Sequence, residues 1–194
     1  MTLWLTLALL ALSAPGGDFF FLQMSDPQFG MYTANKDFVQ ETANFEFAIA
    51  SANRLRPAFV VICGDLVNKE GDPAQIAEYQ RIAAKLDRSI PLHNVAGNHD
   101  VGNEPTPELL AAYRKNFGPD YYTFRHGDFA GIVLDSSLIQ HPDKAPAEAA
   151  KQEAWLTSEL EKLKGQGPGH IAVFQHISYF LEKEIGRASC RERV

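Results

Sequence analysis

The feature that most constrains the fold of this chain is a set of short hydrophobic runs, each of which ends in polar residues. These runs lie at 18–26, 58–63, 91–97 and 170–176. Hydrophobic runs of this length, bounded by turn-forming or polar residues, indicate buried β-strands. Two segments with apolar residues at helical spacing, 37–56 and 73–87, separate the first three runs. Strands that alternate with helices in this way predict an α/β fold.

The later part of the chain combines a hairpin with further helices. Residues 121–137 form two apolar runs around His126-Gly127-Asp128, which predicts a hairpin and therefore antiparallel pairing. Thr106 caps a helix that starts at Pro107, and another helix is expected near 146–163. The sequence thus predicts an α/β layered fold with a mixed sheet.

Composition narrows the classes of function. The 194 residues are 45% hydrophobic and 22% charged, which is typical of one globular domain with a substantial core. The net charge is −6, so we do not expect the basic face that nucleic-acid binding needs. Two cysteines, Cys63 and Cys190, are too few for a disulfide framework. No stretch after the N-terminal segment reads as a stable membrane span.

Polar side chains follow the predicted strands, and their types favour a metal site. They are Asp26 and Gln28, Asp65 and Asn68, Asn98, His99 and Asp100, and Gln175 and His176. Ligands of α/β proteins bind at the carboxyl ends of strands, where these residues lie. Carboxylate, amide and imidazole groups suit Mn, Fe or Zn, and Asp65 after Gly64 is the natural bridge between two ions. The alternative is that each aspartate only caps a turn or a helix.

Four short motifs at these strand ends resemble the calcineurin-like metallophosphoesterases. They are SDPQFG at 25–30, CGDLVN at 63–68, AGNHD at 96–100 and FQH at 174–176. The resemblance extends over about residues 18–183, and longer stretches are similar to a branch described as serine/threonine protein phosphatases. It implies a layered sandwich of mixed β-sheets flanked by helices, incomplete at the C-terminus. It also implies an enzyme that hydrolyses phosphate monoesters through a dinuclear metal-bound hydroxide.

The resemblance assigns a role to each residue of the motifs. The implied metal ligands are Asp26 and Gln28 for the first ion, Asp65 for both ions, and Asn98 and His176 for the second. The cofactors would be two divalent ions (Mn, Fe or Zn), and the partner a phosphorylated small molecule or phosphoprotein. His99 would protonate the leaving oxygen or stabilise charge on the phosphoryl group. Asp100 would hold the other ring nitrogen of His99 and fix its tautomer.

Two departures from the family pattern weaken the expected metal site. Gln28 replaces the usual histidine, so its amide oxygen ligates more weakly or only binds a water molecule. The G-H-x-H motif, which would supply one imidazole to each metal beyond Lys183, does not occur in the chain. We therefore expect weak metal binding and little activity from this polypeptide. A phosphodiesterase or nucleotide hydrolase of the same family, or a non-catalytic binding scaffold, is the alternative.

Both ends of the chain differ from the predicted domain at 18–183. Residues 1–17 contain the uncharged run Leu3–Leu12, which fits the core of a secretory signal peptide, although no Lys or Arg precedes it. A buried N-terminal segment is the alternative. A cleaved signal would make the protein secreted or periplasmic, and without one it would be cytoplasmic. Residues 184–194 lack apolar periodicity and resemble a translated sequencing adapter, so we interpret them as a non-native scar.

Overall fold

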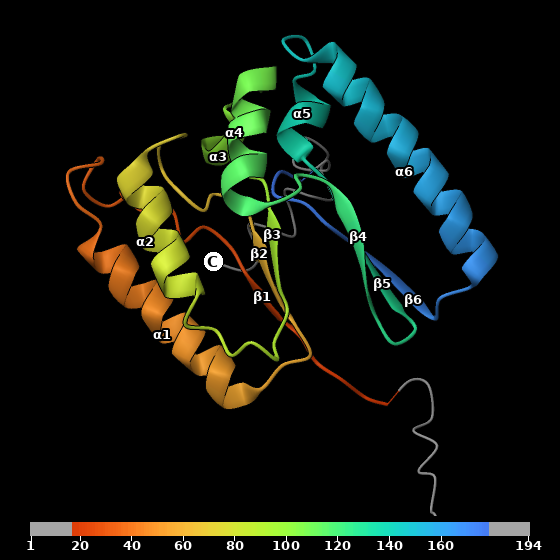
Figure 1. The fold of residues 1–194 in the computed structure, drawn as a ribbon, viewed down its shortest axis with the longest axis horizontal. Coiled ribbons are helices and arrows are strands. Elements are labelled where there is room, and N and C mark those ends of the chain that lie inside the picture. Colours follow the sequence, from red (N-terminus) through yellow and green to blue (C-terminus); the bar gives the residue numbers. More distant parts are fainter. Residues whose placement is uncertain (1–16, 179–194) are drawn as a thin grey trace, which may run out of the picture.

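The computed structural model describes residues 17–178, in which six strands form two separate three-stranded sheets (Figure 1). The first sheet is parallel, in the order β1 (Leu22–Met24), β2 (Val60–Cys63) and β3 (Leu92–Val95). In the second sheet, β4 (Tyr122–His126) pairs antiparallel with β5 (Phe129–Val133), which pairs parallel with β6 (His170–Phe174). The predicted hairpin is confirmed, and the second sheet is mixed as expected, whereas the described pairs of the first sheet are all parallel.

Helices cover the outer face of each sheet and the carboxyl ends of all the strands except β4, which runs antiparallel to β5 (Figure 1). Their bounds are α1 Val39–Leu55, α2 Pro73–Ala83, α3 Asn98–Val101, α4 Pro107–Phe117, α5 Ser136–Gln140 and α6 Pro146–Gln166. In Figure 1, α1 and α2 lie on the outer side of the first sheet and α6 lies along the second, while α3, α4 and α5 gather where the strands end. The result is the layered helix–sheet–sheet–helix sandwich that the resemblance implied.

The alternation of side chains along the strands divides the core into separate clusters. Val60 and Ile62 of β2 pack with residues of α1 and α2, whereas Val61 and Cys63 pack against the second sheet. Alternate residues of β5 contact α6 in the same way. Because both faces of β2 are covered, all four of its residues are buried, which explains why the strand is hydrophobic throughout.

The elements that differ most from their predicted bounds are β1 and α2. β1 covers only Leu22–Met24 of the run 18–26, because ladder pairing with β2 is limited to these three residues. α2 ends at Ala83 rather than near Asp87. The turn that follows it is held by Asn53 of α1, whose Oδ1 accepts the backbone N–H of Asp87 at 2.7 Å. A tertiary contact therefore ends the helix where the apolar pattern alone would continue it.

His93 of β3 lies between the sheets, with its ring stacked on Phe124 of β4 at a centroid distance of 3.6 Å. Burial lowers the pKa of this imidazole to about 4. The folded protein therefore binds fewer protons than the unfolded chain between about pH 4 and the ordinary histidine pKa of about 6.5. The stability that the neutral ring contributes is complete above this window and is lost as the pH falls through it.

We expect the substitution His93→Phe to remove this pH dependence while keeping a stacked ring. From about pH 7.5 to about pH 5, the wild type should lose about 1–2 kcal/mol more free energy of unfolding than the variant, a value reduced for partial solvent exposure. Urea unfolding of both proteins at the two pH values measures this difference. An equal loss in both proteins would contradict a neutral, buried imidazole.

Candidate metal centre and active site

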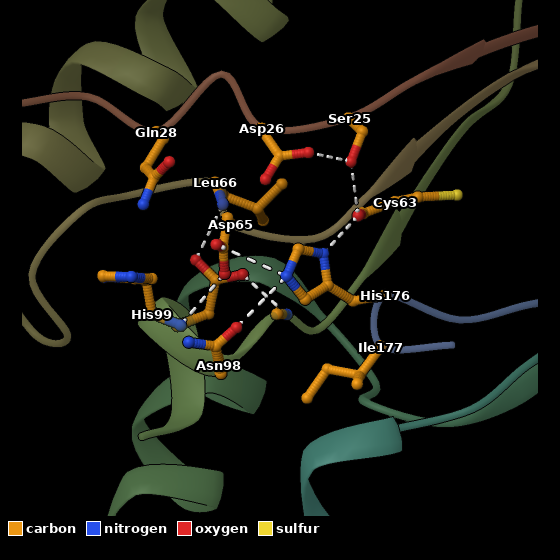
Figure 2. A network of polar contacts seen from close by, with 12 residues as sticks. Ser25, Asp26, Gln28, Cys63, Asp65, Leu66, Asn98, His99, His176 and Ile177 are labelled. Atoms are coloured by element: carbon orange, nitrogen blue, oxygen red, sulfur yellow. Dashed lines mark hydrogen bonds and ion pairs between the residues drawn. The ribbon is translucent and has the colours of Figure 1, made fainter. Parts of the chain in front are cut away.

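Four segments that are far apart in the sequence bring polar side chains to one end of the sandwich. Asp26 follows β1, Asp65 follows β2, Asn98 follows β3, and His176 follows β6. Figure 2 shows these side chains gathered around Asp65. One ligand atom each of Asp26, Asp65 and His176 lies within 4.8 Å of the others. The Oδ1 atom of Asn98 lies 3.2 Å from His176 Nε2, which adds an amide oxygen to the group.

Two glycines allow these segments to approach so closely. A Cβ atom on Gly97 would lie 2.1 Å from the backbone nitrogen of Asp65 and 2.3 Å from its Oδ1. A Cβ atom on Gly64 would lie 2.6 Å from His176 Nδ1, and Gly64 also has a φ of 82°. The glycines of the GD and GN pairs thus leave the room that the Asp65 carboxylate and the His176 ring occupy.

The backbone of the site adopts an uncommon conformation. Asp26, Gln28 and Asp65 have φ angles of 57°, 35° and 51°, and they are three of the six non-glycine residues with positive φ within 17–178. Non-glycine residues in the left-handed region each lower the stability of the fold by about 1–3 kcal/mol, and they concentrate at functional sites. The N–H of Asp26 donates to the carbonyl of Gly64 at 3.1 Å, and that of Gln28 donates to the carbonyl of Asp65 at 2.9 Å. These bonds hold the loops after β1 and β2 together as one unit.

The ring of His176 is oriented by a backbone carbonyl. Its Nδ1 donates to the carbonyl oxygen of Cys63 at 2.8 Å, which leaves Nε2 facing Asn98 and, at 3.4 Å, Oδ2 of Asp65 (Figure 2). Histidines that bind metals are commonly held in this way by their second nitrogen. Burial lowers the pKa of His176, but the bonds to Asp65 and to the Cys63 carbonyl outweigh burial and raise it to about 9. A cation that binds Nε2 therefore has to displace a proton.

The role predicted for Asp100 is wrong in its geometry. Rather than holding the His99 ring, its Oδ1 accepts the backbone N–H groups of Leu66 at 2.9 Å and Val67 at 3.1 Å. Its Oδ2 accepts the N–H of Gly97 at 2.9 Å. Burial raises the pKa of Asp100 to about 7, although these N–H donors lower it. Asp100 therefore joins the loop after β2 to the turn that begins α3, because buried backbone donors need acceptors.

His99 is oriented by Asn68 instead. Its Nδ1 lies 2.8 Å from the backbone carbonyl of Asn68, and because a carbonyl only accepts, Nδ1 carries the proton. The backbone N–H of His99 donates to Asp65 Oδ1 at 3.0 Å. In Figure 2 the His99 ring and the His176 ring lie on opposite sides of Asp65. Nε2 of His99 is therefore the ring nitrogen that a bound substrate can reach.

Gln28 stands beside the two aspartates, where the family pattern has a histidine. Its side chain is buried, and its Nε2 donates to Oδ1 of Asn68 at 3.3 Å. Because the amide nitrogen is bonded in this way, the amide oxygen is the atom that remains for a cation. Ligation by this oxygen stays a prediction.

Gln75 of α2 belongs to the site, although the sequence does not single it out. It is buried, and its Oε1 accepts the backbone N–H groups of Asn68 and Lys69, both at 3.0 Å. Its Nε2 donates to Oδ1 of Asn35 at 2.8 Å. These bonds fix the loop whose carbonyl orients His99. Glutamine is common in the first turn of a helix, so no local sequence pattern could have indicated this role.

A model of the family described as calcineurin-like phosphoesterase matches residues 21–192. The chain belongs to the calcineurin-like phosphoesterase family. The match includes all six strands and every residue of the candidate site. It confirms the resemblance that the GD and GNHD motifs carry.

Curated relatives from two mammals have the name serine/threonine-protein phosphatase CPPED1. The bovine protein is 37% identical and the human protein 36% identical, each over 181 residues. Both comparisons cover 86% of this chain and 58% of the relative, so the chain spans a little over half of their length. A solved purple acid phosphatase from yellow lupin has a TM-score of 0.58 at 11% identity, covering 82% of this chain and 30% of its own. At that identity the likeness supports the fold alone.

Several predictions about the chain ends fall outside the described residues. The predicted scar at 184–194 lies there entirely, and the predicted signal peptide at 1–17 does so except for its last residue. Both stay predictions, as does the localisation that depends on the signal. Within 17–178, no helix is both long enough and apolar enough to cross a membrane.

Proposed function

We propose that this protein is a metal-dependent phosphoesterase that hydrolyses phosphate monoesters, including those of serine and threonine side chains. The observation that carries the proposal is the convergence of Asp26, Asp65 and His176, whose ligand atoms lie within 4.8 Å of one another. Family membership supports ester hydrolysis. The names of the bovine and human relatives support the choice of serine and threonine phosphomonoesters.

The donors of the site fit divalent cations. Carboxylate and amide oxygens with one imidazole suit Mn, Fe or Zn, and the His176 ring already presents Nε2 to the carboxylates. We assign Asp26 and the Gln28 oxygen to a first ion, Asp65 to both ions, and Asn98 and His176 to a second. When bound, such a pair supplies a hydroxide nucleophile near neutral pH and stabilises the charge of phosphoryl transfer.

The protein's own groups would orient the reaction and move its proton. Nδ1 of His99 is bonded to the carbonyl of Asn68, so the second proton of the imidazolium form sits on Nε2. From Nε2 it passes to the leaving oxygen as the ester P–O bond breaks. The N–H of His99 is bonded to Asp65, and Asp100 holds the same turn through Gly97. The proton donor is therefore fixed relative to Asp65, the residue that would hold both ions.

Hydrolysis of p-nitrophenyl phosphate and bis(p-nitrophenyl) phosphate by chelator-treated protein, with and without millimolar Mn²⁺, tests the proposal. We expect metal-dependent hydrolysis that is faster for the monoester, at a low rate because the chain has no G-H-x-H motif. Hydrolysis of the diester alone would favour a phosphodiesterase. If the protein neither hydrolysed these esters nor took up Mn²⁺, a binding scaffold would be favoured.

Substitution of Gln75 is expected to act on the rate rather than on substrate affinity. Gln75→Leu removes the acceptor that fixes the Asn68 loop, so kcat should fall about 10- to 100-fold with little change in KM. Gln75→Glu keeps an acceptor for both N–H groups but turns a carboxylate oxygen towards Oδ1 of Asn35, so it should recover only part of the loss. Steady-state kinetics with p-nitrophenyl phosphate measure both variants. A wild-type kcat in Gln75→Leu would show that the loop holds His99 without this amide.

A further inference from the structure

A cavity of about 250 Å³ adjoins the candidate metal centre, between the end of β1 and α1. Asp26 lies in its lining, together with Glu41 and Asn44 of the helix. Asp26 and Asn44 are exposed, whereas Glu41 and the apolar residue Phe45 are buried. The cavity therefore leads from the surface beside the metal centre to Glu41.

Glu41 is a buried carboxylate without a counter-charge in the described part of the chain. Glu41 is only 3% exposed. Oε1 accepts the backbone N–H of Tyr32 at 2.9 Å, but Oε2 has no hydrogen-bond partner among residues 17–178. Burying a charge or a polar atom without a partner is costly, so such an atom calls for an explanation.

The position of Glu41 and the lining of the cavity determine what could pair with it. Glu41 lies in the first turn of α1, where the helix dipole stabilises negative charge. The lining residues of the cavity include no Lys, Arg or His, and several are apolar, among them Met24, Phe45 and Ile62. The complementary ligand is therefore a cation or strong hydrogen-bond donor on a short apolar stem. An anion would meet two carboxyl groups there and no cationic side chain, so we place the phosphoryl group at the metal centre.

The geometry points to a subsite in which Glu41 binds an ammonium group carried by the leaving alcohol of a phosphate monoester. This assignment rests on the proposed function, because the phosphoryl end of the ester would be held at the metal centre, which shares Asp26 with the cavity. In the reaction, an oxygen from water forms the new P–O bond and the ester P–O bond breaks. The leaving oxygen takes up a proton, and the products are inorganic phosphate and an amino alcohol. Among phosphate monoesters, the subsite thus favours those of amino alcohols.

Kinetics in the presence of Mn²⁺ compare O-phosphoethanolamine with ethyl phosphate, which lacks only the ammonium group. We expect kcat/KM to be at least about tenfold higher for the ammonium ester, since a hydrogen bond to a charged group is among the stronger ones. Glu41→Gln keeps the shape of the side chain and should bring the ratio close to one. Glu46→Gln, on the same helix but facing Arg81 and Lys85, should leave the ratio unchanged.

Binding of ethanolammonium to the metal-free protein tests the cavity without any activity. The backbone N–H of Tyr32 donates to Glu41, so its NMR signal should move and saturate as ethanolammonium is added. The same movement is expected in Glu46→Gln and not in Glu41→Gln. If Glu41→Gln fails to fold, the wild-type titration and the wild-type comparison of the two esters still test whether the cavity binds an ammonium group.

The outcomes separate this subsite from the proposed function. Equal kcat/KM values for the two esters, with an unmoved Tyr32 signal, overturn the ammonium subsite even if p-nitrophenyl phosphate is hydrolysed. A saturable Tyr32 shift without hydrolysis of any ester supports the cation site and overturns the proposed function instead. Discrimination between the esters that disappears in Glu41→Gln supports both.

Discussion

Replacing Asp65 with asparagine is expected to abolish metal-dependent hydrolysis and to weaken cation binding by more than about 100-fold. Residues that only orient a ligand change metal affinity by about 10- to 100-fold. Asp65 is itself proposed as a ligand, and one of its carboxylate oxygens lies within 4.8 Å of ligand atoms of Asp26 and His176. The fold should survive, because asparagine tolerates the positive φ of this position as aspartate does. Titration with Mn²⁺, followed by electron paramagnetic resonance, and assays with p-nitrophenyl phosphate measure the two losses.

Asp128→Asn is the matched control for this substitution. Asp128 is an exposed aspartate in the turn between β4 and β5, remote in sequence from the candidate ligands, and its replacement changes the net charge equally. Metal binding and hydrolysis should stay at the wild-type level. If Asp65→Asn bound Mn²⁺ as tightly as Asp128→Asn does, Asp65 would not be a shared ligand, and the assignment of two ions would fail.

The position of the site could be predicted from the sequence because it depends on the fold and little else. Hydrophobic runs indicate strands, and residues after parallel strands meet at one end of the sheet. Asp26, Asp65 and Asn98 follow β1, β2 and β3 in this way. His176 needed the further condition that β6 runs parallel to β5 and ends beside Cys63, and the lone FQH motif indicated it.

The contacts within the site could not be predicted, because several of them involve backbone N–H and C=O groups, which do not depend on residue type. The resemblance to the family implied that Asp100 orients His99. In the structure the partner of His99 is the backbone carbonyl of Asn68, a group that every residue has. Gln75 and Glu41 were missed for a related reason, since each lies in the first turn of a helix, where polar residues are common. Only burial distinguishes them.

Gly97→Ala is expected to disrupt the site and to destabilise the fold, although it adds only a methyl group. The φ of Gly97 is −105°, which alanine adopts readily, so backbone conformation is not the obstacle. The added Cβ would lie 2.1 Å from the nitrogen of Asp65, and backbone atoms cannot turn aside as a flexible side chain can. We expect a loss of about 2–3 kcal/mol in the free energy of unfolding, as for other overpacked positions, together with loss of Mn²⁺ binding.

Gly165→Ala makes the same chemical change where there is room for it. Gly165 lies within α6, and a Cβ there would meet no atom within 4 Å. Alanine in a helix should raise the free energy of unfolding by about 0.5–1 kcal/mol. Urea unfolding of the two variants beside the wild type should therefore give effects of opposite sign. A Gly97→Ala protein as stable as Gly165→Ala would show that Asp65 can move away at little cost, and that the glycine before Asn98 is not needed for close approach.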